Sequence, residues 1–235
     1  MAALIPVIIT LFLCSPALAG SGTIQWKAEG WDPMGNEDGI RTYSIEDPKS
    51  GLLGVGGEVL LPAGAAKVVD VLLDDKHKAQ WLDKFDTART LQTVSDREFV
   101  LYGSFNMPFP ISDRDFVYRY KFSWDQAAGA LVVDITEATH KEAPEEDTVG
   151  VRGRVRIGRY VLQPRDGGKR TFVQVKYLAD PGGFLPGFLV NYVQKKWPRN
   201  TLDGLRKQVV KPFVKDHSII TRTFLQDFRK ADGSS

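Results

Sequence analysis

Residues 104–122 read Ser104-Phe-Asn-Met-Pro-Phe-Pro-Ile-Ser-Asp-Arg-Asp-Phe-Val-Tyr-Arg-Tyr-Lys-Phe122, a proline-rich loop that runs directly into a stretch with an aromatic side chain at every second position. Successive side chains of a β-strand point to opposite faces of the sheet. One face of this strand therefore carries five aromatic residues: Phe116, Tyr118, Tyr120, Phe122 and Trp124. Such a wall is either packed core or the lining of a cavity, and the alternation alone does not distinguish the two.

The same alternation predicts a sheet of about eight strands around this one. The expected strands are 40–46, 52–61, 89–94, 98–105, 115–124, 130–138, 149–161 and 171–178. Regular period-two patterns are typical of antiparallel strands with one face in water. In the strand 149–161, Arg152, Arg154 and Arg156 fall on one face, which predicts either an ordinary wet surface or a basic surface for a partner or an anionic lipid.

Helical patterns flank the strands. Ala65, Val68, Val69 and Leu72 form one apolar stripe after Pro62. A shorter helical piece is expected over 76–82, and a short surface helix within 21–39. From residue 184 onward, apolar residues keep helical spacing as far as Phe213, with a kink near Trp197 because Pro198 follows it. The sequence therefore predicts an α+β fold in which a curved antiparallel sheet wraps around a long C-terminal helix.

The chain ends and composition limit the function classes. Residues 1–19 carry no charge, contain a short apolar run and end in Ala17-Leu18-Ala19, a pattern typical of a secretory signal peptide cleaved after Ala19. We therefore expect a signal peptide at 1–19, one domain at 20–215, a C-terminal tail at 216–235, and a secreted or periplasmic location. The alternative is an uncleaved anchor. If cleavage occurs, Cys14 is lost and the mature chain has no cysteine. A net charge of +2 argues against a nucleic-acid binder, and the three histidines have no metal-like spacing.

Three segments resemble the START (StAR-related lipid transfer) domain family, and in particular its secreted bacterial members. They are residues 39–43 after Trp26, residues 68–81 followed by 109–117, and residues 180–186 with 190–191 and 205–206. This resemblance implies a helix-grip fold with an interior cavity for a lipid, and a lid formed by the C-terminal helix and nearby loops. It implies carriage and not chemistry, with a transient membrane contact. We also expect no cofactor, no metal and a monomer.

The resemblance and the strand faces together give candidate site residues. The candidate ligand contacts are Phe105, Phe116, Tyr118, Tyr120, Val133, Val155, Leu189, Tyr192 and Val193. The candidate membrane or lid residues are Phe184, Leu185 and Phe188. Arg114 and Asp115 match the family motif and are expected to be structural, as an ion pair or a loop clamp at the strand entrance.

One departure from the family pattern bears on the ligand. Several members place an arginine inside the cavity six residues after the motif arginine, with an acidic partner on the preceding strand, and these positions here are Tyr120 and Gly103. We therefore expect a weakly polar or neutral lipid that is hydrogen-bonded by the Tyr118 and Tyr120 hydroxyls. The alternatives are an enzyme of the polyketide cyclase or aromatase type on the same architecture, and an interaction protein with a filled core. The predicted inward faces offer no catalytic constellation, because a tyrosine at its ordinary pKa is a poor base at neutral pH.

Overall fold

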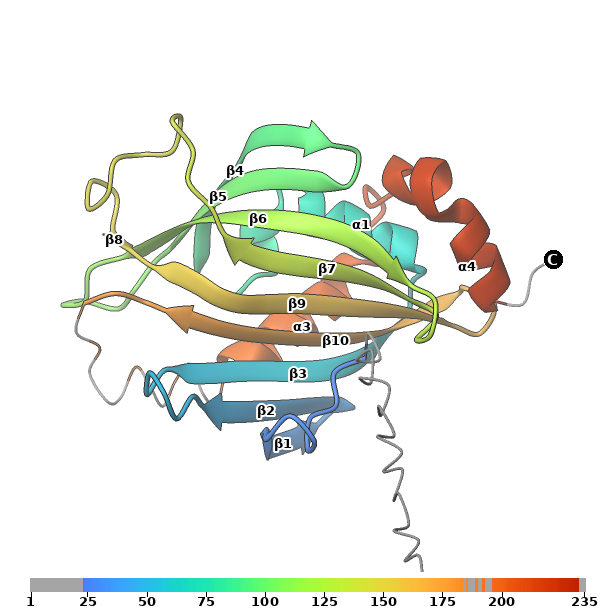
Figure 1. Cartoon of the computed structure of the whole chain (residues 1–235), viewed down its shortest axis with the longest axis horizontal. Coiled ribbons are helices and arrows are strands. Elements are labelled where there is room, and N and C mark those ends of the chain that lie inside the picture. The colour runs from blue at the N-terminus through green and yellow to red at the C-terminus, as the bar shows by residue number, and fades with distance from the viewer. Residues whose placement is uncertain (1–22, 184, 186–188, 190–191, 193–195, 233–235) are drawn as a thin grey trace, which may run out of the picture.

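The computed structural model describes residues 23–183, 185, 189, 192 and 196–232. Their strands form one ten-stranded sheet: β1 (Asp32–Glu37), β2 (Ile40–Glu46), β3 (Leu53–Leu61), β4 (Phe85–Ser95), β5 (Glu98–Phe105), β6 (Arg114–Asp125), β7 (Ala130–Glu137), β8 (Val151–Arg152), β9 (Arg154–Arg165) and β10 (Arg170–Asp180). The order is β1-β2-β3-β10-β9-β7-β6-β5-β4, all antiparallel, and β8 pairs in parallel with β6. The sheet is open and curved, and the helices α1 (Ala65–Leu73) and α3 (Trp197–Gln208) lie on one side of it (Figure 1). The predicted α+β helix-grip architecture is confirmed.

The main core fills the space between the sheet and these two helices. Val68, Val69 and Leu72 of α1 are buried in it, as the apolar stripe predicted. Leu202 and Leu205 of α3 face the same core, and Gly204 lets α3 approach the chain at Trp81, where an added Cβ would lie 2.1 Å from the carbonyl oxygen. The 76–82 segment is a shorter element than predicted, a single 3₁₀ turn η1 over Lys78–Gln80.

The short helix predicted within residues 21–39 is wrong, because Asp32–Glu37 forms the edge strand β1. Trp26 and Trp31, which suggested a surface helix, instead pack against the outer side of the sheet. The Trp26 ring stacks on Tyr43 with centroids 4.2 Å apart, and its indole nitrogen donates a hydrogen bond to Glu58 at 2.8 Å. Strand pairing and this cluster hold the segment extended.

The long strand predicted over 149–161 is divided at Gly153 into β8 and β9. A Cβ on Gly153 would lie 2.3 Å from the Phe116 ring, so the glycine makes room for that side chain. The break also separates the three arginines. Arg152 binds Asp115, whereas Arg154 and Arg156 both lie near Glu137.

The helix α3 begins at Trp197, with Pro198 in its first turn, where a proline needs no backbone N–H partner. The residues after Lys215, predicted to be a tail, form the π-helical turn η2 (Ile220–Phe224) and the helix α4 (Leu225–Asp232). Ile219, Ile220 and Phe224 are buried in the main core. The domain boundary at residue 215 stays a prediction, but the segment beyond it contributes to the packing.

In the part of the chain that the structure describes, no helix is long and apolar enough to cross a membrane.

Candidate functional site

A cavity of about 560 Å³ lies between the inner face of the sheet and the segment that leads into α3. A volume of this size is within the range of small-molecule sites. Its lining residues are Gly51, Leu52, Leu53, Val55, Leu82, Lys84, Phe105, Met107, Pro108, Arg114, Phe116, Tyr118, Tyr120, Ile135, Val155, Tyr177, Ala179, Pro181, Leu185, Leu189, Tyr192 and Trp197. Most are apolar, so the cavity suits a hydrophobic ligand.

The aromatic strand β6 is cavity lining at one end and packed core at the other. Phe116, Tyr118 and Tyr120 line the cavity. Phe122, two residues further, is buried in the core beside Phe99, with ring centroids 5.9 Å apart. Trp124 packs on Phe228 of α4, with centroids 4.8 Å apart. The cavity therefore has a mouth near the start of β6 and an inner end, formed by Tyr118, Tyr120 and Tyr177, next to the core.

The inner end carries the polar groups most suited to orient a ligand. Tyr177 of β10 lies beside Tyr160 of β9, with the two ring centroids 5.9 Å apart, and Tyr160 is buried. Burial raises the pKa of Tyr160 to about 12 and raises the pKa values of Tyr118, Tyr120 and Tyr177 as well. All four phenols are therefore protonated at neutral pH, and their hydroxyls are hydrogen-bond donors and acceptors in an apolar surrounding.

Asp83 anchors the segment that covers the cavity from the α3 side. Its carboxylate accepts hydrogen bonds from the Tyr192 hydroxyl at 2.5 Å and from the Asn200 side-chain amide at 3.2 Å. Its backbone oxygen accepts one from the Trp197 indole at 3.1 Å. Burial, followed by this contact with Asp83, raises the pKa of Tyr192 to about 12. Two cavity-lining aromatic rings are thus fixed in place by one acidic residue.

At the mouth, Arg114 holds two loops together. Its guanidinium donates to the carbonyl oxygens of Pro181 at 3.0 Å and Gly182 at 3.2 Å, and also to that of Ser112. Because Pro181 and Gly182 follow β10 and Ser112 precedes β6, the arginine fastens both sides of the opening. The structure thus places Arg114 as a loop clamp and not in an ion pair with Asp115.

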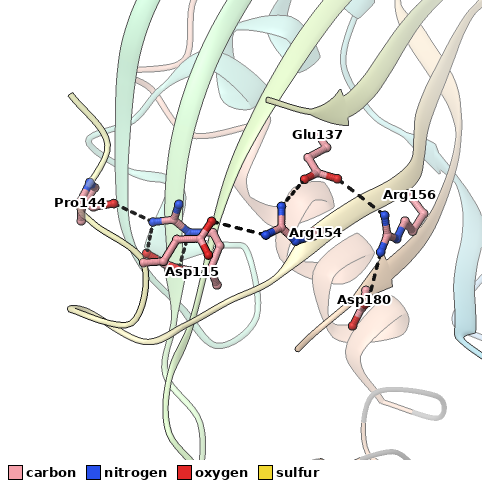
Figure 2. A network of polar contacts seen from close by, with 8 residues as sticks. Asp115, Glu137, Pro144, Arg154, Arg156 and Asp180 are labelled. Carbon is pink, nitrogen blue, oxygen red and sulfur yellow. Dashed lines mark hydrogen bonds and ion pairs between the residues drawn. The ribbon is translucent and has the colours of Figure 1, made fainter. Parts of the chain in front are cut away.

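Asp115 has a different partner. Its two carboxylate oxygens accept hydrogen bonds from Arg152 at 2.8 and 3.0 Å, and Arg152 also donates to the Pro144 carbonyl at 2.8 Å. Figure 2 shows this bidentate pair beside a row of ion pairs, in which Arg154 binds Glu137 and Glu146, and Arg156 binds Glu137 and Asp180. The predicted basic row is therefore matched by carboxylates, and nothing in these contacts favours a basic docking surface.

The remaining predicted site residues divide into three groups. Phe105, Phe116, Tyr118, Tyr120, Val155, Leu189, Tyr192 and Leu185 line the cavity. Val133 lies in the packed core and not at the cavity. Val193, Phe184 and Phe188 lie outside the described residues.

Sequence reasoning missed several lining residues, among them Tyr177 and Trp197. Tyr177 could have been found, because it lies in a predicted strand, but its face was not assigned. It also missed the reason for Gly103: an added Cβ there would lie 2.8 Å from the Phe85 ring, so an aromatic side chain occupies the space. Among the described residues, no group of three or more His, Cys, Asp or Glu side chains is placed to hold a metal ion.

Comparisons with known proteins agree with this fold. The START domain family matches residues 21–209, and the chain belongs to that family. Mouse phosphatidylcholine transfer protein is 29% identical over 202 residues, which cover 83% of this chain and 87% of the relative. The crystal structure of a STAR-related lipid transfer protein from Xanthomonas axonopodis is 29% identical with a TM-score of 0.63, covering 77% of this chain and 99% of that one. Human STARD10 shares the fold with a TM-score of 0.68 at 17% identity, covering 88% and 82%.

Proposed function

We propose that this protein is exported from the cytoplasm, binds one lipid in the cavity, and carries it as a monomer through transient contact with membranes. The single observation that carries the proposal is the 560 Å³ apolar cavity with three tyrosine hydroxyls at its inner end. Apolar burial supplies the binding free energy at about 25 cal/mol per Å² of surface removed from water. The similarity to a phosphatidylcholine transfer protein supports lipid carriage as the general activity.

The ligand we propose is weakly polar or neutral. Tyr118, Tyr120 and Tyr177 offer neutral hydroxyls. The charged lining residues lie elsewhere: the Arg114 guanidinium contacts the loops at Ser112 and Pro181, and Lys84 Nζ lies 5.8 Å from the centroid of the Tyr192 ring. Arg114 already donates to three backbone carbonyls. A lipid with a small hydroxyl or ester head can therefore place that head among the tyrosines and its chain towards the mouth.

The tyrosine hydroxyls of the cavity favour binding of a ligand over catalysis. The tyrosines have raised pKa values, so they stay protonated at neutral pH and supply no phenolate to act as a general base. Since no particular observation favours a cyclase or aromatase reaction, we infer carriage.

The membrane contact we propose is at the mouth. Phe109 is 97% exposed in the loop between β5 and β6, beside the lining residues Met107 and Pro108. An exposed phenylalanine next to the opening of an apolar cavity is suited to enter a lipid surface, as interfacial aromatic anchors do. It adds to the candidates Phe184, Leu185 and Phe188.

Native mass spectrometry tests this function. The full chain is expressed in a bacterial host, the product is recovered from the periplasm, and its bound lipid is extracted and identified. We expect a chain that begins at Gly20 and one lipid per protein with an uncharged head. An apo mass that persists after incubation with a mixed lipid extract would overturn carriage, a preference for phosphatidylcholine would overturn the neutral-lipid assignment, and an uncleaved product would overturn export by a cleaved signal.

A further inference from the structure

A buried lysine, paired with a partly exposed aspartate, lies near Tyr120 at the inner end of the cavity. Lys78, in the 3₁₀ turn η1, is 1% exposed, which is rare for a lysine. Its Nζ lies 3.5 Å from a carboxylate oxygen of Asp75, whose other oxygen accepts hydrogen bonds from the Thr90 backbone N–H at 2.5 Å and hydroxyl at 2.7 Å. Asp75 is thus held firmly, whereas the lysine has one long contact.

The amine is oriented towards the cavity wall. Lys78 Nζ lies 6.0 Å from the centroid of the Tyr120 ring, at the outer edge of the range for a cation–π contact. Tyr120 is a lining residue at the inner end. Burial lowers the pKa of Lys78, and the carboxylates of Asp75 and Asp74 act in the opposite direction. Whatever its protonation state, the amine occupies the space over this ring face.

This arrangement acts differently on different lipid heads. Quaternary ammonium groups are recognised by the faces of aromatic rings, and an inner end with three tyrosines would otherwise suit such a group. Lys78 already covers one of those faces, and when protonated it repels a second cation. An oxygen atom of a ligand, in contrast, meets phenol donors, and when Lys78 is protonated its positive charge strengthens a hydrogen bond to that oxygen.

We propose that Lys78 is a specificity-determining residue that excludes lipid heads carrying a quaternary ammonium group from the inner end and favours heads that offer only oxygen acceptors, neutral or anionic. This proposal rests on the proposed function, and it names the class of ligand for the same site. It also replaces the view, drawn from Tyr120 and Gly103 alone, that charge is absent from this part of the cavity.

The test uses lipids that share their tails and differ in their heads. Dioleoylglycerol, dioleoylphosphatidic acid and dioleoylphosphatidylcholine are offered in equal amounts to the full-length chain and to its K78M variant, and the bound fractions are read by native mass spectrometry. We expect the unaltered protein to bind dioleoylglycerol and dioleoylphosphatidic acid in preference to dioleoylphosphatidylcholine. In K78M the ratio should shift towards phosphatidylcholine by about tenfold, because the substitution removes the group that covers the Tyr120 ring and repels the choline ammonium.

The matched control is K76M, which removes an exposed lysine two residues away and should leave the ratio unchanged. Because K78M removes the ion-pair partner of Asp75, a D75N/K78M double variant is read in the same way if the single variant fails to fold. A K78M ratio equal to the unaltered one, or an unaltered protein that prefers phosphatidylcholine, would overturn the role of Lys78. Failure of all three lipids to bind the unaltered protein would instead overturn the proposed function.

Discussion

His217 connects the C-terminal segment to α1 and makes the stability of the fold sensitive to mild acid. Its backbone N–H donates to the Ala66 carbonyl at 3.2 Å, and its ring Nδ1 accepts from the Ile219 N–H at 3.2 Å. Burial lowers the pKa of the imidazole, Arg222 lowers it further, and Asp70 acts in the opposite direction. The folded state therefore disfavours the protonated ring, which would also lose its hydrogen bond from Ile219.

The sign of the resulting pH dependence follows from linkage. An unfolded histidine titrates near pH 6.5, so the contribution of His217 is complete above that pH and is lost as the pH falls towards the lower folded pKa. We expect the loss of Tm between about pH 7.5 and about pH 5.5 to be smaller in H217Q than in the unaltered protein. H140Q, in an exposed loop, is the control. Equal losses of Tm in all three proteins would show that His217 does not contribute.

At the residue scale, the alternation of side chains along a strand predicted which residues of β6 line the cavity. It could not predict which side chains from other elements pack next to them. Tyr118 and Tyr120 follow from the pattern of β6, and the structure puts both at the cavity. Lys78 could not be found, because a lysine after a short apolar stripe is usually solvated, and its burial depends on η1 packing beneath Tyr120. Val133 was misassigned because the inward face of β7 meets packed core at that position.

At the element scale, the contact between α3 and η1 depends on Gly204. An added Cβ would lie 2.1 Å from the Trp81 carbonyl oxygen and 2.9 Å from its carbonyl carbon, and these backbone atoms cannot rotate away. Replacing glycine by alanine within a helix ordinarily stabilises a protein. A loss of stability in G204A would therefore report the steric clash with the Trp81 backbone. We expect G204A to destabilise the fold by about 1–3 kcal/mol, as overpacking does, measured by urea unfolding.

The matched control is G35A in the edge strand β1, where the added Cβ would be 3.4 Å from Thr42, close to an ordinary contact distance. A G204A protein as stable as G35A would mean that α3 can shift away from η1 without cost.

The strands were more predictable from the sequence than this contact between α3 and η1, because the alternation of side chains depends only on neighbouring residues. The exceptions were β1, which is held by pairing and by Trp26, and the break at Gly153, which is set by the Phe116 ring.

At the scale of the whole molecule, the sequence predicts a curved sheet packed around a helix. It does not predict which part of the space between them is cavity and which part is packed core. Alternating strands and a long apolar helical pattern require the two to pack together. Whether the inner face is filled depends on side chains from several elements meeting at one place. In this protein the divide falls between Tyr120, at the cavity, and Phe122, in the core.

This division leaves the cavity open near the β5–β6 loop, where Phe109 is exposed, so transfer between membranes should depend on that side chain. We expect F109S to slow lipid transfer between donor and acceptor vesicles by about tenfold, because it removes apolar area that enters the bilayer, while the lipid bound per protein stays the same. V94S is the control, since Val94 is also exposed but lies towards the opposite end of β4 from Phe85, away from the mouth. Transfer that is equally fast in F109S and V94S would mean that the β5–β6 loop does not contact the membrane. A loss of bound lipid in F109S would mean that the loop holds the ligand instead.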